Sequence, residues 1–252
     1  MQVIPVLDLL DGHAVRAVRG ERSRYRPIQS SLCATSDPVS IARALVAATG
    51  SRTLYVADLG AILLRGAHDH ALAALCDTLG DGFDIWLDAG FTAFAPMRAL
   101  VERITRLSRS AAPAAIVPVF GTETLLDIGA IAEASACGFE PILSLDYRGG
   151  GALGAGHIES AWWPSRVIVM TLDHVGAYAG PDLETLTAVR AIAGARKVIG
   201  AGGVRNDADL ALAADGGAGA WLVASAIHDG TVGRRDVDRG AGSALASPSS
   251  DG

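Results

Sequence analysis

Two aspartates at matching positions are the residues of this chain best suited to chemistry. Asp8 follows the apolar run at residues 3–7, and Asp146 follows a similar run at 141–145. A carboxylate at the end of a buried strand costs little folding free energy if the strand emerges into a site. The sequence "LLDG" after Asp8 is also typical of a turn, so Asp8 could simply end the strand. Two carboxylates that face each other across a sugar suit acid–base catalysis, because one takes a proton while the other delivers one.

The segments around these aspartates alternate between strand and helix. Apolar runs of strand length recur at residues 3–7, 53–57, 84–87, 114–120, 141–145, 166–172, 197–201 and 220–224. Helix-like segments lie between them at 37–50, 68–80, 94–108, 122–138, 181–194 and 206–219, and several begin with Asp, Asn or Thr and end at Gly. This alternation predicts parallel strands, and eight units in 252 residues favour a single closed (β/α)8 TIM barrel over an open sheet.

The alternation also sets the expected domain limits. One barrel domain spans residues 1–232, and the Gly-, Ser- and Ala-rich stretch 233–252 is expected to be a flexible tail, since it lacks apolar periodicity. The first crossover (residues 9–40) and the fifth (147–165) are long. We expect both to lie over the site as lids.

A barrel carries its functional residues at the carboxyl ends of its strands. In chain order, the predicted ends carry Asp8, Asp58, Asp88, Gly121 to Glu123, Asp146, Thr171 to Asp173, Gly202 and Gly203, and Ala224 and Ser225. Any one of these carboxylates could cap the following helix, but the whole set predicts a polar mouth. The tight turn "IGAGGVRND" (199–207) after the seventh strand suits a phosphate held by backbone N–H groups, with the loop after the eighth strand completing the site.

Composition and residue usage argue against several classes of protein. The net charge is −6 with no dense Lys/Arg run, which argues against a nucleic-acid surface, and no segment has the length and apolarity of a membrane span. The three cysteines are widely spaced and match neither a disulfide framework nor a metal site, so we expect a cytoplasmic protein without metal or organic cofactor. Lys197 is the only lysine and begins a strand, which disfavours Schiff-base chemistry. A retaining glycosidase needs carboxylates about 5 Å apart, closer than opposite walls of a barrel mouth.

Several motifs together resemble one known family. They are "IPVLDLLDGHAVR", "VRG" (18–20), "LYVADL" (54–59), "FGT" (120–122), "SLDYRGG" (144–150), "MTLDHVGAYAGPD" (170–182), "IGAGGVRNDADL" (199–210) and "ASAIHDG" (224–230). In this order they resemble the HisA/HisF family of histidine biosynthesis, a barrel of the ribulose-phosphate-binding type. HisA is the isomerase of phosphoribosylformimino-aminoimidazole carboxamide ribotide, and "DYRGG" looks more like HisA than like the cyclase HisF.

The resemblance implies a role for each matched position. Asp8 would be the general base and Asp146 the general acid of an Amadori-type aldose–ketose rearrangement of a small phosphorylated sugar derivative, with Thr171 in support. Gly202, Gly203 and Ser225, with Ala224, would hold one phosphate. Gly90, Gly121 and Thr122 would hold the other, and the remaining candidates for substrate contact are Arg19, Asp58, Asp88 and Asp173.

The chain departs from the family at both phosphate loops. The third strand ends in "DAGFT" (88–92) instead of a run of glycines, so Asp88 brings negative charge and Ala89 a side chain to one phosphate cradle. Ala224 replaces a glycine, and Ser225 replaces a basic residue. "VFGTETL" and "DAGF" look instead like a HisA/HisF-related branch of methanogens and methylotrophs, and the substrate is expected to carry one phosphate, or none on the third-strand side.

Three alternatives stay open at this point. A HisF-like cyclase would need a glutaminase subunit docked at the bottom of the barrel to supply ammonia. A paralogous isomerase or lyase in the biosynthesis of a C1 cofactor, of the tetrahydromethanopterin or methanofuran type, would fit the altered phosphate loops. A non-catalytic binding barrel would retain the aspartates only as relics.

Overall fold

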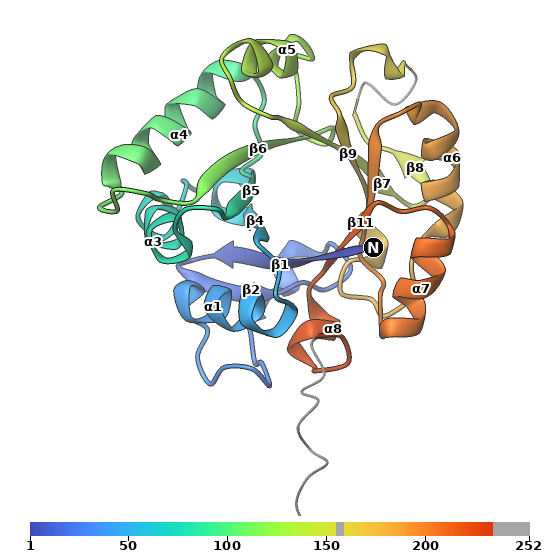
Figure 1. The fold of residues 1–252 in the computed structure, drawn as a ribbon, viewed down its shortest axis with the longest axis horizontal. Coiled ribbons are helices and arrows are strands. Elements are labelled where there is room, and N and C mark those ends of the chain that lie inside the picture. The colour runs from blue at the N-terminus through green and yellow to red at the C-terminus, as the bar shows by residue number, and fades with distance from the viewer. Residues whose placement is uncertain (155–158, 234–252) are drawn as a thin grey trace, which may run out of the picture.

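The computed structural model describes residues 1–154 and 159–233 and contains a closed barrel (Figure 1). Its parallel strands are β1 (Gln2–Leu10), β4 (Thr53–Asp58), β5 (Asp84–Asp88), β6 (Ala115–Gly121), β7 (Ile142–Arg148), β9 (Arg166–Thr171), β10 (Lys197–Ala201) and β11 (Ala220–Val223). Each strand pairs with the next, and β11 returns to β1 with Ala220 beside Gln2. The predicted (β/α)8 barrel is confirmed, and each predicted strand segment coincides with one of these strands.

Helices surround the ring of strands (Figure 1). They are α1 (Pro38–Thr49), α3 (Asp69–Leu79), α4 (Phe94–Leu107), α5 (Gly129–Ala136), α6 (Leu183–Ala193) and α7 (Asp207–Asp215), with the short α2 (Leu59–Ile62) and α8 (Ser225–His228). Side chains of Asp37, Asp182 and Asn206 accept hydrogen bonds from first-turn N–H groups of α1, α6 and α7. These helix starts therefore follow the capping chemistry that the sequence predicts.

The helix predicted at 122–138 is wrong in its first half, because α5 begins only at Gly129. The preceding residues form a loop whose N–H groups have other partners. Those of Thr124 and Leu125 donate to the Gly121 carbonyl, and that of Leu126 donates to the Thr92 carbonyl. The loop is thereby held against the end of β6 and the neighbouring loop after β5.

Two barrel strands run further than the apolar runs predict. The first and fifth crossovers fold back as β2 (His13–Arg16) and β8 (Gly151–Ala152), which pair antiparallel with the ends of β1 and β7. β3 (Arg26–Pro27) pairs with β2, and short 3-10 turns complete the connections: η1 (Arg22–Arg24), η2 (Ser160–Trp162) and η3 (Leu172–His174). Because this pairing continues the hydrogen-bond ladder, Asp8 and Asp146 lie inside their strands and not at the predicted ends.

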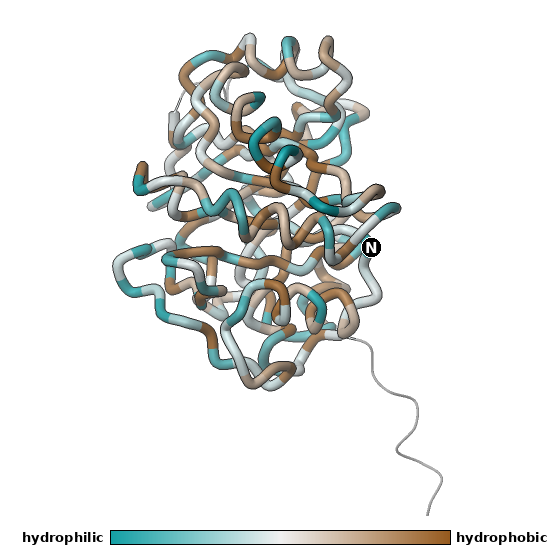
Figure 2. The backbone as a smooth tube through the Cα atoms, turned by 90° about the vertical axis from the view of Figure 1, so that its left-hand side faces the viewer, coloured by the Kyte–Doolittle hydropathy of each residue, from teal (hydrophilic) through white to brown (hydrophobic). Residues whose placement is uncertain are grey.

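Strand alternation decides which side chains face the barrel interior. Successive side chains of a strand point to opposite faces. Along β1, Ile4 packs in the inner core, whereas Leu7 and Leu9 pack in the layer between strands and helices. Asp8 shares the inward parity of Ile4, and Asp146 shares that of Ile142. Figure 2 shows hydrophobic stretches running through the interior of the molecule.

The expectations about membrane spans and about the C-terminal tail remain. In the described part of the chain, no helix has the length and apolarity needed to cross a membrane. The predicted tail lies outside the described residues from position 234 onward.

Candidate active site

One cavity opens where the carboxyl ends of the barrel strands meet, and every barrel strand contributes to its lining. Asp8, Asp88 and Asp146 line it, as do Gly202 and Gly203 after β10. Ala224, Ser225 and Gly121 also face this cavity, and the first crossover adds Arg22 and Tyr25. The structure thus brings both predicted catalytic aspartates together with the predicted glycine turn.

Asp146 is held by neighbouring groups on both of its oxygens. The Ser144 hydroxyl donates to Oδ1 at 2.7 Å, and the Glu123 N–H donates to Oδ2 at 2.9 Å. Its own N–H donates to the Thr122 hydroxyl oxygen at 2.9 Å. Burial raises the pKa of Asp146 to about 7 against the opposing Glu123 hydrogen bond, and the charge of Asp88 raises it further. This carboxyl can therefore hold a proton near neutral pH.

Asp8 differs from Asp146 in its hydrogen bonding. No hydrogen bond from within residues 1–154 or 159–233 reaches its carboxylate, which faces the cavity. Burial raises its pKa to about 7, the Arg22 guanidinium lowers it, and the charge of Asp88 raises it. An oxygen without a protein donor is available to a proton of a bound molecule, as a general base requires.

Asp88 is a third carboxylate in the same part of the cavity. The Tyr55 hydroxyl donates to its Oδ2 at 3.0 Å, and the Gly90 N–H donates to its Oδ1 at 3.0 Å. Burial raises its pKa, and these two hydrogen bonds oppose that rise. A Cβ atom on Gly121 would lie 2.9 Å from Asp146 Oδ2 and 3.9 Å from Asp88 Oδ2, so only glycine leaves room between the two carboxylates.

An ion pair between the first crossover and the loop after β6 also lines the cavity. Both terminal nitrogens of Arg22, in η1, donate to the carboxylate of Glu123, which follows β6. Arg148, at the end of β7, lies 3.8 Å from the same carboxylate. Because the Glu123 N–H also binds Asp146, this ion pair connects the predicted lid to a catalytic candidate.

Sequence reasoning missed Arg22, Tyr25 and Tyr55 as site residues, and it placed Glu123 at a strand end without giving it a role. Two of the missed residues had a signal in the sequence. Four arginines crowd residues 19–26 of a long crossover, and Tyr55 is a hydroxyl-bearing residue between apolar neighbours in its strand. The prediction chose Arg19, which is exposed and does not line the cavity.

The glycine turn after β10 forms the other side of the cavity. Gly202 and Gly203 both have φ near +81°, and a Cβ on Gly203 would lie 1.9 Å from the Gly180 carbonyl oxygen. The Gly180 N–H donates to the Gly203 carbonyl at 2.9 Å, and Trp221 Nε1 donates to the Gly202 carbonyl at 3.0 Å. The turn is therefore fixed by contacts from two directions.

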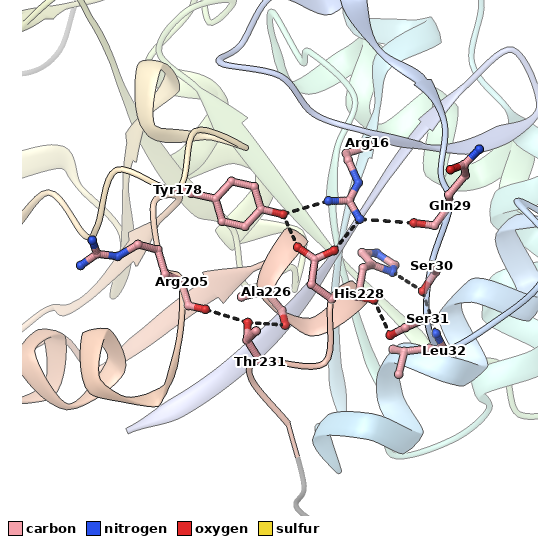
Figure 3. Close-up of polar contacts among 11 residues, drawn as sticks. Arg16, Gln29, Ser30, Ser31, Leu32, Tyr178, Arg205, Ala226, His228 and Thr231 are labelled. Atoms are coloured by element: carbon pink, nitrogen blue, oxygen red, sulfur yellow. Dashed lines mark hydrogen bonds and ion pairs between the residues drawn. The ribbon is translucent and has the colours of Figure 1, made fainter.

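A polar cluster connects the first crossover to the loop after β9 and to the end of α8 (Figure 3). Arg16 donates to the Tyr178 hydroxyl at 2.9 Å and to Asp229 Oδ1 at 2.8 Å, and the Tyr178 hydroxyl also donates to Asp229. Burial lowers the pKa of His228 to about 4, so this imidazole is neutral where it contacts the Ser30 hydroxyl. The cluster holds both loops at the Ser225 side of the mouth.

Six of the predicted site residues do not line the cavity: Arg19, Asp58, Gly90, Thr122, Thr171 and Asp173. Thr171 donates to Asp182, the N-cap of α6, on the outer side of β9. Asp173 is exposed and accepts from the Gly149 N–H. Gly90 and Thr122 contact Asp88 and Asp146, so they reach the site through those aspartates.

Asp58 has a structural role that the sequence did not distinguish from substrate binding. It is fully buried and accepts hydrogen bonds from the Ala61 and His68 N–H groups at 3.1 and 2.8 Å. The His68 ring lies against it with Nδ1 at 2.7 Å. It therefore holds α2 and the start of α3 to the end of β4.

Asp58→Ala is expected to lower the free energy of unfolding by about 2–4 kcal/mol, because it leaves buried donors without a partner. The urea midpoint from circular dichroism measures this loss. Asp173→Ala, at an exposed position, is the matched control and should change the midpoint little. Equal midpoints for the two variants would contradict the structural role.

The described residues contain no group of three or more His, Cys, Asp or Glu side chains arranged to hold a metal ion.

The family model described as "Histidine biosynthesis protein" matches residues 2–233. The chain belongs to this family. The match covers the whole barrel, including all the residues that line the cavity.

Similar proteins cover nearly the full length of this histidine biosynthesis family member. An uncharacterized protein of Methanocaldococcus jannaschii is 27% identical over 240 residues, which are 94% of this chain and 97% of the relative. The 1-(5-phosphoribosyl)-5-((5-phosphoribosylamino)methylideneamino)imidazole-4-carboxamide isomerase of Thiobacillus denitrificans is 27% identical over 253 residues, covering 92% of each chain. The isomerase of the same name from Haloarcula marismortui is 28% identical over 248 residues, covering 91% of this chain and 92% of its own.

Proposed function

We propose that this barrel is a HisA-like isomerase, an intramolecular oxidoreductase that catalyses an Amadori-type aldose–ketose rearrangement of a phosphorylated sugar derivative. One observation carries the proposal: Asp8 and Asp146 line the same cavity as the Gly202–Gly203 turn. The isomerase names of the full-length relatives support the same reaction class.

The two aspartates divide the proton transfers of such a rearrangement. Protonated Asp146 gives its proton to the ring oxygen of the N-glycoside. The bond from C1 to that oxygen breaks as the nitrogen lone pair forms a C1=N bond. Asp8 then removes the proton from C2, the electrons form a C1=C2 double bond, and the C=N pair returns to nitrogen. Ketonisation makes the C2 carbonyl and adds a proton at C1.

The electrostatics of the site support this division. The pKa values of both carboxyl groups are about 7, so a state in which Asp146 is protonated and Asp8 is ionised is populated at neutral pH. Asp146 is fixed by Ser144 and Glu123, as an acid that must aim at one atom requires. Asp8 has no such donor within the part of the chain that the structure describes, and it is assigned as the base.

The glycine turn is proposed to hold a phosphate. Gly202, Gly203, Ala224 and Ser225 line the cavity side by side, and backbone approach is possible because the first two lack a Cβ. Thr171 and Thr122 would support the site indirectly. Thr171 does so through its hydrogen bond to Asp182, and Thr122 through its hydrogen bond with the Asp146 N–H.

The description of the matching family favours histidine biosynthesis as the pathway, with a small phosphorylated molecule as the only partner and the cytoplasm as the place of action. The cyclase alternative, with its glutaminase, has no comparable support among the named relatives. The paralogue acting on a different phosphorylated substrate is the second candidate, and Asp88 in the cavity favours it.

The reaction is tested with the purified chain in D2O. A panel of N-(5-phosphoribosyl) amines, including the isomerase substrate of the relatives, is incubated with the protein and followed by NMR. We expect at least one aldose to become a ketose carrying deuterium at C1, because ketonisation adds a solvent-exchanged proton there. A folded protein that converts no member of the panel would overturn the proposal.

The pathway is tested separately, by expressing the chain in a histidine auxotroph that lacks the isomerase. Growth without histidine would assign the chain to that pathway. No growth despite folded expression would favour the second candidate and leave the reaction class to the NMR experiment.

A further inference from the structure

The part of the cavity next to β5, β6 and β7 is dominated by carboxylates. Asp88, Glu123 and Asp146 lie on or just after these strands and line the cavity, and Asp8 of β1 lines the same cavity. Arg22 is the single Lys, Arg or His among the described residues that line the cavity, and Glu123 already binds both of its terminal nitrogens. Little positive charge is therefore left for an anionic ligand on this side.

Two backbone donors on this side are also occupied. The Gly90 N–H donates to Asp88, and the Glu123 N–H donates to Asp146. These are the loops after β5 and β6, where N–H groups would otherwise point at a bound anion. The carboxylates of the chain itself take the place that phosphate oxygens would need.

Burial raises the pKa of Asp88, but two hydrogen-bond donors favour its charged form. The Tyr55 hydroxyl and the Gly90 N–H each donate to one of its oxygens, and such donors favour the charged form. Neither contact comes from a cation, and among the described residues the Arg22 guanidinium lowers its pKa through charge. A phosphate here would meet a like charge in a partly desolvated site, whereas a protonated amine would meet an opposite charge.

We propose that Asp88 determines substrate specificity, by binding a cationic or N–H-donating nitrogen of the substrate and excluding a second phosphate. The substrate is then a nitrogen-bearing sugar monophosphate, with its phosphate at Gly202, Gly203 and Ser225. This inference rests on the proposed function for the identity of the cavity as the active site, but it concerns binding and not turnover.

The test compares ligands that differ only in phosphate number. The probes are the isomerase substrate of the relatives, whose name contains two phosphoribosyl groups, and its two monophosphorylated derivatives. Isothermal titration calorimetry measures their Kd for the unmodified chain, Asp88→Asn and Asp88→Gly. Asp84→Asn removes the same charge from the other end of β5 and is the matched control.

The unmodified chain and Asp84→Asn should bind one monophosphate at least about tenfold more tightly than the bisphosphate. Asp88→Asn and Asp88→Gly should each reduce or reverse that preference by about tenfold. Tighter binding of the bisphosphate by the unmodified chain, an unchanged preference in both Asp88 variants, or no binding of any probe would each overturn the inference.

These outcomes are distinguishable from failure of the proposed function. A chain that binds with the expected preference but converts no aldose would refute the isomerase and keep the role of Asp88. A chain that isomerises the bisphosphate, and binds it more tightly than either monophosphate, would support the isomerase and refute the role of Asp88. Asp88→Gly is included because the asparagine amide of Asp88→Asn could still form hydrogen bonds to the ligand.

Discussion

Asp8→Asn is expected to lower kcat for the rearrangement by about 10³-fold or more, while making the folded protein more stable. General acid–base catalysis contributes about 10²–10⁴-fold, and an amide cannot take the proton from C2. The shape of the side chain is preserved, so binding of the monophosphate should change little. Loss of activity without loss of binding would separate a catalytic role from a structural one.

The gain in stability follows from the raised pKa of Asp8. Its pKa is about 7 in the folded state, against an ordinary value of 3.8, so the folded chain binds this proton more tightly than the unfolded chain. The free energy of unfolding therefore falls as the pH rises from about 4 to 7. The amide that replaces the carboxyl group does not ionise, so the variant escapes this loss. Each pKa unit corresponds to about 1.4 kcal/mol, so Asp8→Asn should gain a few kcal/mol above pH 7.

Thermal unfolding at pH 8 and at pH 4 measures this effect. The variant should have a Tm about 5 °C or more above that of the unmodified chain at pH 8, and nearly the same Tm at pH 4. Asp84→Asn, on the opposite end of the barrel, is the control for removing a carboxylate. A lower Tm for Asp8→Asn at pH 8, or an activity near that of the unmodified chain, would contradict the assignment of Asp8 as the buried base.

The barrel could be predicted from the sequence because each strand is a short apolar run, and several of the helices between strands begin with a capping side chain. Local chemistry decides both features, as Asp37, Asp182 and Asn206 show. The extensions of β1 and β7 could not be predicted, since they depend on crossovers that fold back and pair with them. Such pairing does not produce a hydrophobic periodicity within the strand's own sequence, so the sequence pattern does not reveal it.

The site residues could be predicted where the alternation of a strand determines which side chains face the cavity. They could not be predicted where a side chain has several possible hydrogen-bond partners. Asp8, Asp88 and Asp146 face the cavity because they lie on inward positions of their strands. Asp58 also ends a strand, but it turns to the N–H groups of Ala61 and His68. Thr171 turns outward to Asp182. A strand-end carboxylate or hydroxyl alone does not reveal which alternative its neighbours offer.

The same limit applies to Arg22. Its contact with Glu123 joins residues that are 101 positions apart, and it depends on how the first crossover lies over the mouth. Charge density marks the crossover as important, but it does not select one arginine among four.

The glycine turn offers a second large effect: Gly203→Ala is expected to abolish phosphate binding and to destabilise the fold. The new Cβ would lie 1.9 Å from the Gly180 carbonyl oxygen, a distance that no side chain tolerates. Relief requires the loop after β9 to move away, which breaks the hydrogen bond from the Gly180 N–H to the Gly203 carbonyl. The turn would then lose the geometry that aims its backbone at the ligand.

Gly138→Ala separates this clash from ordinary backbone strain. Gly138 has φ +87°, close to the +81° of Gly203, but a Cβ there would meet nothing within 4 Å. Gly138→Ala should cost about 1 kcal/mol and leave the Kd of the monophosphate unchanged, because only the left-handed backbone is penalised. Gly203→Ala should cost several kcal/mol in urea unfolding and raise that Kd beyond measurement. Similar losses of stability in both variants, with binding retained, would mean that the Gly180–Gly203 contact does not shape the phosphate site.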